Sequence, residues 1–212
     1  MENIVSSINI EMGVKEVDSD LQITAKAGVQ FATMGINILR SIPPLNFDEA
    51  TDKATAQLSE SQFIGKVCAG NLLFAQGLEL LLKLVLLTEN ISEKGLGQHK
   101  LSIRYDKLKN LEPIATNLNT YMPAKCGNKT KSAELVVSMA ENAFLTSRYI
   151  GLKKDNLRSI DPMDAAGLLL SLCLSYKGME QLEAMHAIGL EVKNANGKTI
   201  LPDRFELKAK VR

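Results

Sequence analysis

The chain has 212 residues, of which 45% are hydrophobic and only 5% aromatic, and it contains no tryptophan. This composition argues against an aromatic-rich β-sandwich and favours helices packed on helices. The formal net charge is +1; residues 65–212 carry 21 basic and 15 acidic side chains, an excess of +6 that is far below the footprint of a dedicated nucleic-acid binder. We therefore expect one all-α domain over residues 1–212.

The first seventeen residues alternate loosely between apolar and polar side chains, which is typical of a short strand or an extended arm. The opening letters MENIVSSINIEMG lack a basic stretch followed by an apolar core. We therefore expect no secretory signal and a cytoplasmic protein.

A first helix is expected next, because SDLQ forms a capping box in which Ser19 is the cap and Gln22 reaches back to it. Small and apolar residues then share one face of this helix, namely Leu21, Ala25, Gly28, Ala32, Gly35 and Leu39. The small side chains allow a partner helix to approach closely, and Pro43 and Pro44 end the element. A short helix is expected over residues 47–58.

A second capping box, with Ser59 as cap and Gln62 as its partner, predicts a long helix to about Leu87. This helix is apolar on nearly every side, and its few polar residues share one stripe: Gln76, Glu79 and Lys83. Because Glu79 and Lys83 interrupt the apolar run, we interpret it as the central helix of a bundle and expect no membrane association.

Three further helices are expected. The first is a single helix over KLSIRYDKLKNLEPIATNL, with one set of side chains inward (Leu101, Tyr105, Leu108, Leu111) and another outward (Lys100, Arg104, Lys107, Lys109). The second runs from Ser132 to Leu152, with apolar residues at helical spacing: Leu135, Val136, Met139, Ala143, Phe144 and Ile150. The third begins at the cap Asp161 with Pro162 in its first turn and continues to about His186. The tail, residues 188–212, changes to period two, so we expect a hairpin or strand that could pair with the N-terminal arm.

The residues that commonly carry chemistry are few. Cys68, Cys126 and Cys173 stand far apart without a CxxC pair, so we expect reduced cysteines, no metal site and no cofactor. His186 suits a structural role in the last turn of its helix. His99, which opens a helix beside a lysine, is the stronger candidate for a functional histidine.

Three motifs along the chain point to a family. FAQGLELLLKLVLL contains Glu79 and Lys83, GQHKL contains His99, and AFLTSRY ends with Arg148 and Tyr149. Together they resemble HEPN domains, small α-helical bundles of higher eukaryotes and prokaryotes. The resemblance covers roughly residues 60–187.

The resemblance implies an up-and-down helical bundle, a homodimer, and a role in a prokaryotic toxin–antitoxin or phage-defence system. The short β or extended segments at the termini are expected from the residue patterns given above. It also implies RNA, a nucleotide or an antitoxin-type protein as partner. Many HEPN domains are metal-independent endoribonucleases that carry an arginine and, after four to six residues, a histidine. Here Lys153, Lys154 and Asp155 occupy the positions where that histidine would follow Arg148. We therefore favour binding or regulation over catalysis.

Two interpretations of Arg148 remain open. In the first, Arg148 forms an ion pair inside the bundle with Glu79, or with Glu141, and fixes the helix register. In the second, Arg148, Lys83, His99 and Tyr149 converge on a pocket for RNA or a nucleotide. Two alternative functions follow: a divergent endoribonuclease that uses Arg148 with His99 or His186 as catalytic residues, and a structural module that binds a partner protein.

Overall fold

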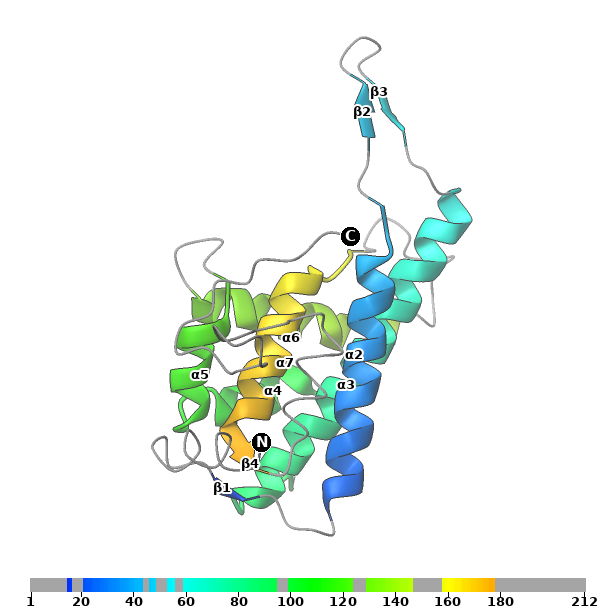
Figure 1. The fold of residues 1–212 in the computed structure, drawn as a ribbon. Coiled ribbons are helices and arrows are strands. Elements are labelled where there is room, and N and C mark those ends of the chain that lie inside the picture. Colours follow the sequence, from blue (N-terminus) through cyan, green and yellow to red (C-terminus); the bar gives the residue numbers. More distant parts are fainter. Residues whose placement is uncertain are drawn as a thin grey trace, which may run out of the picture.

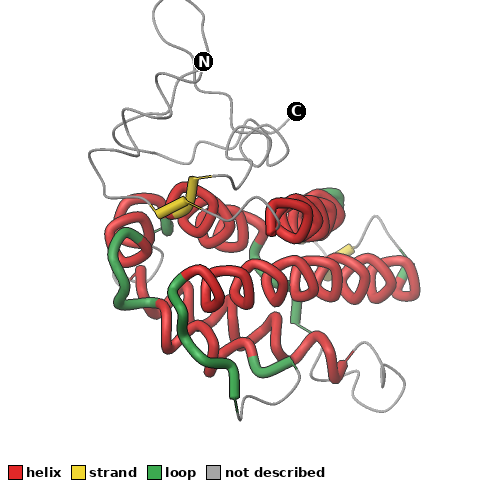
Figure 2. Tube along the Cα trace, turned by 90° about the horizontal axis from the view of Figure 1, so that it is seen from below, coloured by secondary structure: helices red, strands yellow, loops and turns green. Residues whose placement is uncertain are grey.

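The computed structural model describes residues 15–16, 21–43, 46–48, 53–55, 59–94, 99–123, 129–146 and 158–177, and its described part is all-α, with six helices packed together (Figure 1). The helices are α2 (Gln22–Arg40), α3 (Glu60–Thr88), α4 (Leu101–Leu108), α5 (Ile114–Tyr121), α6 (Lys129–Thr146) and α7 (Pro162–Ser175). Four strands of two or three residues accompany them: β1 (Lys15–Glu16), β2 (Asn46–Asp48), β3 (Lys53–Thr55) and β4 (Tyr176–Lys177). Figure 2 shows the helices lying against one another, seen from below.

Helices α2 and α3 run antiparallel and in direct backbone contact. A Cβ atom added at Gly35 would lie 2.5 Å from the backbone nitrogen of Phe74, and one added at Gly77 would lie 2.3 Å from that of Ala32. Such distances are shorter than any van der Waals contact, so these positions have room only for glycine. The predicted close approach of a partner helix to the small residues of α2 is confirmed.

Helix α3 occupies the centre of the bundle and has the predicted cap. The Ser59 side chain accepts a hydrogen bond from the Gln62 backbone, and the Gln62 side chain accepts one from the Ser59 backbone, which completes the capping box. The segment Ser61–Thr88 is long and apolar enough to cross a membrane, but 67% of its most apolar window is buried in the bundle. A core helix of a helical bundle is equally long and apolar, and it is buried in the same way.

Two predicted elements near the N-terminus are wrong in extent or type. Helix α2 starts at Gln22 with Leu21 as an N-cap that makes no side-chain hydrogen bond, and Ser19 lies outside the described residues. The expected helix over 47–58 is replaced by the antiparallel pair β2–β3, which extends beyond the ends of α2 and α3 in Figure 1. A segment this short, with few apolar residues to bury, gains too little from packing to stabilise a helix.

The expected single helix after residue 100 is two helices, because α4 ends at Leu108 and α5 begins only after Pro113. Proline has no backbone N–H to donate within a helix, which explains the break. The inward positions of Leu101, Tyr105 and Leu108 are confirmed, since all three are buried. Helix α6 begins at Lys129, three residues earlier than expected, and Leu135 on it is exposed, contrary to the prediction.

Helix α7 has the predicted N-terminus but a different end. The Asp161 carboxylate accepts hydrogen bonds from the backbone of Met163 and Asp164, and Pro162 stands in the first turn. The helix ends at Ser175 instead of near residue 186, because Tyr176 becomes extended and pairs in parallel with Lys15 of β1. The N-terminal arm therefore does pair with a strand, although with β4; the predicted partner, residues 188–212, lies outside the described residues.

Two of the three cysteines, Cys68 and Cys173, are buried and free. Burial raises the pKa of the Cys68 thiol and raises that of Cys173 to about 12. Neither thiol is therefore activated as a thiolate nucleophile. Cys126 lies outside the described residues.

Candidate functional site

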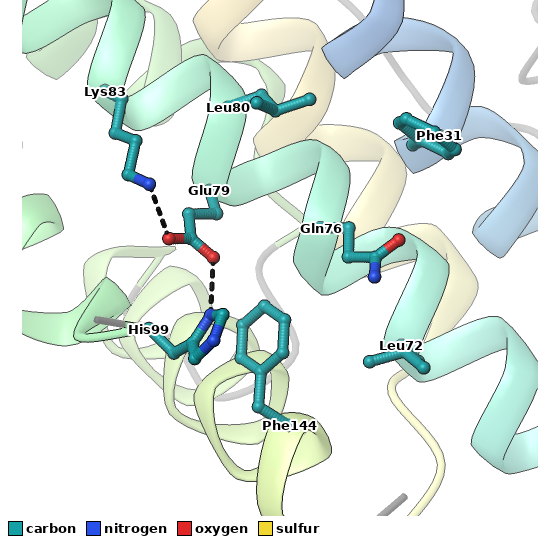
Figure 3. Close-up of a pocket in the computed structure, with 8 residues that line it drawn as sticks. All are labelled: Phe31, Leu72, Gln76, Glu79, Leu80, Lys83, His99 and Phe144. Atoms are coloured by element: carbon teal, nitrogen blue, oxygen red, sulfur yellow. Dashed lines mark hydrogen bonds and ion pairs between the residues drawn. The ribbon is translucent and has the colours of Figure 1, made fainter.

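A pocket of about 540 Å³ opens along α3, where the predicted polar stripe faces it. Half of its lining is apolar (Phe31, Leu72, Leu80 and Phe144) and half is polar (Gln76, Glu79, Lys83 and His99). The lining comes from α2, α3, α6 and His99, two positions before α4 (Figure 3). The i, i+3, i+7 spacing on α3 therefore marks a cavity wall.

Glu79 is the centre of the polar half. One carboxylate oxygen, Oε1, lies 2.8 Å from Nζ of Lys83, and the other, Oε2, lies 2.8 Å from Nδ1 of His99 (Figure 3). The carboxylate is nearly buried, with 9% of the side chain exposed, whereas Lys83 and His99 are 38% and 37% exposed. Glu79 thus holds two partly exposed nitrogen groups at the pocket.

His99 is fixed by its backbone and by its ring. The residue has φ 57°, in the left-handed region that non-glycine residues seldom adopt. Its ring stacks on Phe144 with a centroid distance of 4.2 Å. An ionised carboxylate only accepts hydrogen bonds, so Nδ1 of His99 carries a hydrogen and donates it in a hydrogen bond to Glu79. In the neutral ring Nε2 then keeps its lone pair.

Arg104 lies behind this site, and the prediction that it points outward is wrong. Only 2% of the residue is exposed; its Nε donates to Oε1 of Glu93 over 2.7 Å, and its Nη1 lies 4.0 Å from Oε1 of Glu79. The signal was present in the sequence, because Arg104 stands at i+3 from Leu101 and i−4 from Leu108, on the apolar face of α4. The outward position was expected only because arginine is charged.

The charges around Glu79 change its acidity. Burial alone raises the pKa of this carboxyl, but the hydrogen bonds and positive charges of Lys83 and His99 outweigh burial and lower it below the ordinary value. Glu79 is therefore ionised at neutral pH, and it pairs with Lys83 there.

The structure brings together some of the predicted site residues. Lys83 and His99 meet at the same carboxylate, as the pocket hypothesis requires. Arg148, Tyr149 and His186 lie outside the described residues, so an ion pair between Glu79 and Arg148 stays a prediction.

The other proposed partner of Arg148 already has a role at the start of α4. A single carboxylate oxygen of Glu141, Oε2, accepts hydrogen bonds from the backbone nitrogen and the hydroxyl of Ser102, and Nζ of Lys100 lies 3.7 Å from Oε1. Glu141 on α6 thus caps α4 in place of a side chain from α4 itself.

The described residues include no cluster of three or more histidine, cysteine, aspartate or glutamate side chains that could hold a metal ion. Among the described residues, the pocket instead offers the ion pair of Glu79 and Lys83, one histidine, the amide of Gln76 and apolar walls. These groups suit an organic ligand with a planar part and an anionic part.

Comparison with known proteins adds no identification: no protein-family model, no curated protein and no solved structure matches this chain. The functional argument therefore depends on the pocket itself.

Proposed function

We propose that this protein binds RNA or a nucleotide in the pocket between α3 and α6, as a binding or regulatory protein. One observation carries the proposal: Glu79 holds Lys83 and His99 side by side, next to the Phe144 ring, in an open pocket. The Lys83 ammonium suits a phosphate group, as does His99 when Nε2 of its ring also carries a proton, and aromatic and aliphatic walls suit a base. A volume of about 540 Å³ falls within the range of pockets that enclose a small organic ligand.

The HEPN resemblance is a second argument for this proposal. The motifs that suggested it supply Lys83 and His99, which were expected to converge. We accordingly propose an HEPN-like up-and-down bundle in the cytoplasm, acting as a homodimer in a toxin–antitoxin or phage-defence setting. The exposed apolar residues Ile23, Phe31 and Met34 share a side of α2, which is consistent with a contact to a second copy.

Replacing Lys83 with methionine and His99 with glutamine together is expected to weaken RNA binding at least tenfold. The loss of the charge-assisted contact from Lys83 to phosphate, about 1.5 kcal/mol or more, by itself accounts for this magnitude. The measurement is fluorescence anisotropy with a fluorescein-labelled RNA of mixed sequence and, in competition, AMP. Light scattering in the same buffer gives the oligomeric state.

Lys131→Ala is the matched control, because Lys131 is an exposed lysine on α6 outside the pocket. It removes the same charge from the surface and should leave the affinity within about twofold, a change of roughly 0.4 kcal/mol. Equal weakening by Lys131→Ala and by the double substitution would mean that RNA binds through diffuse surface charge, and unaltered affinity in the double variant would rule out the pocket.

A specific observation favours a second function, the divergent endoribonuclease. The Glu79–His99 pair is arranged for proton transfer, since the carboxylate orients Nδ1 and leaves Nε2 free to act as a base. In such a reaction Nε2 takes the proton of a ribose 2′-hydroxyl, O2′ bonds to phosphorus, and the bond from phosphorus to O5′ breaks, with O5′ protonated by water. The products are a 2′,3′-cyclic phosphate and a 5′-hydroxyl.

If this second function holds, the purified protein cleaves RNA in the presence of EDTA, and His99→Gln lowers the rate by about 100-fold or more. Gel electrophoresis of an end-labelled RNA measures the cleavage, and Arg148→Ala is assayed beside it. RNA that is bound by the wild type but stays intact would leave binding as the function.

A further inference from the structure

Gln76 occupies the middle of the pocket wall, one turn of α3 before Glu79 (Figure 3). Its side chain is exposed to the pocket, and its neighbours one turn away on either side are Leu72 and Leu80. Within the described part of the chain its amide makes no hydrogen bond, whereas Lys83 and His99 each bond to Glu79. Gln76 is thus the uncommitted polar group of this lining.

A primary amide presents a donor and an acceptor side by side in one plane. Between Leu72 and Leu80, this pair is satisfied by a planar group that offers the complementary acceptor and donor. A nucleobase is such a group, and the glutamine amide pairs with the N6 amino group and N7 of adenine in two parallel hydrogen bonds.

The spacing along α3 suits a complete nucleotide. Seven residues separate Gln76 from Lys83, a rise of about 10 Å along the helix. That rise leaves room for a sugar between a base at Gln76 and a phosphate at Lys83 and His99. The aromatic ring of Phe31, on α2, lines the same pocket as Gln76.

We propose that Gln76 reads the hydrogen-bonding edge of the base, with adenine as a ligand of the wild-type protein. The inference rests on the proposed binding of a nucleotide in this pocket and adds the residue that sets its base preference. A carboxylate at the same position would have acceptors only. It would lose the match to N7 of adenine and gain one to guanine, whose N1–H and N2 amino group are both donors.

Gln76→Glu is therefore expected to shift the ratio of AMP to GMP affinities about tenfold or more toward GMP, as for one bidentate contact to a base. Isothermal titration calorimetry with AMP and with GMP measures this ratio for the wild type, Gln76→Glu and Gln76→Leu. The leucine variant keeps the size of the side chain without its polar atoms, and it should weaken AMP binding without the gain for GMP. Using a ratio removes the general repulsion between an added carboxylate and the phosphate.

The outcomes separate this inference from the function on which it rests. A wild type that binds neither the RNA pool nor a mononucleotide overturns both. A wild type that binds RNA or AMP, with the affinity ratio unchanged in Gln76→Glu, overturns the role of Gln76 alone. Because Gln76 is exposed, both substitutions should leave the fold unchanged. Circular dichroism of each variant checks that its helix content equals that of the wild type.

Discussion

Gly77→Ala is expected to lower the free energy of unfolding by about 2 kcal/mol, the cost of inserting a methyl group into a filled contact. The added Cβ would lie 2.3 Å from the backbone nitrogen of Ala32 and 2.5 Å from the carbonyl oxygen of Gly28. Both atoms belong to the backbone of α2, so the clash cannot be relieved by a side-chain rotation and α2 must move away from α3. Urea unfolding followed by circular dichroism measures the change.

Gly65→Ala is the matched control, because Gly65 lies on the same helix and a Cβ there would meet no atom within 4 Å. Alanine has a higher helix propensity than glycine by up to about 1 kcal/mol, so this substitution should stabilise the protein slightly. Opposite signs at the two positions are the expected result. If both variants were stabilised, the close packing of α2 on α3 would be wrong.

Glu79→Ala is expected to lower the free energy of unfolding by about 1.5 kcal/mol, the low end for hydrogen bonds to a charged group, because Lys83 and His99 are partly exposed and solvent screens them. Without the carboxylate, Arg104 stays buried with the partly exposed Glu93 as partner, and Lys83 and His99 lose the group that holds them together. Thermal and urea unfolding measure the loss. Glu134→Ala on the exposed side of α6 should change stability far less, since surface pairs contribute little.

The dependence on pH distinguishes the charge of Glu79 from its shape. Because the folded state lowers the pKa of this carboxyl, the unfolded state binds the proton more tightly, and acid favours unfolding. The stabilising contribution is complete above the ordinary glutamate pKa, about 4.3, and is lost as pH falls through the lower folded value. Wild type should therefore exceed Glu79→Gln in stability at pH 7 and approach it below pH 4, a range set by the same ordinary value. A difference that stays constant over this range would argue against a charge effect.

Local sequence signals predicted the parts of the fold that depend on neighbours in the chain. The capping box at Ser59 and the cap at Asp161 mark the starts of α3 and α7, because both are satisfied within one turn of helix. The small residues of α2 predicted a close helix contact, and the polar stripe of α3 contains three of the eight residues that line the pocket. Lys83 and His99 were named as site residues from the motifs that resemble HEPN domains.

Other features depend on contacts between segments far apart in the sequence. Gln76 and Phe31 were not recognised as pocket residues. A pocket forms between helices, and the pattern of a single helix does not show which other helices lie opposite its side chains. The end of α7 at Ser175 depends on pairing between Tyr176 and the N-terminal arm, 161 positions away in the chain (176 − 15). A helix pattern alone carries no information about that competing strand.

The amino-acid sequence by itself determined the all-α class, the central helix α3 and the helix caps, since helical periodicity and capping are properties of residues within a few positions of one another. Tertiary structure decided the partners of Glu79. Lys83 follows it by one turn, but His99 and Arg104 come from beyond a loop, and burial gives Arg104 an inward position that its charge alone argues against. A buried carboxylate is stable only where cations converge on it, and that convergence exists only once α3, α4 and α6 are packed together.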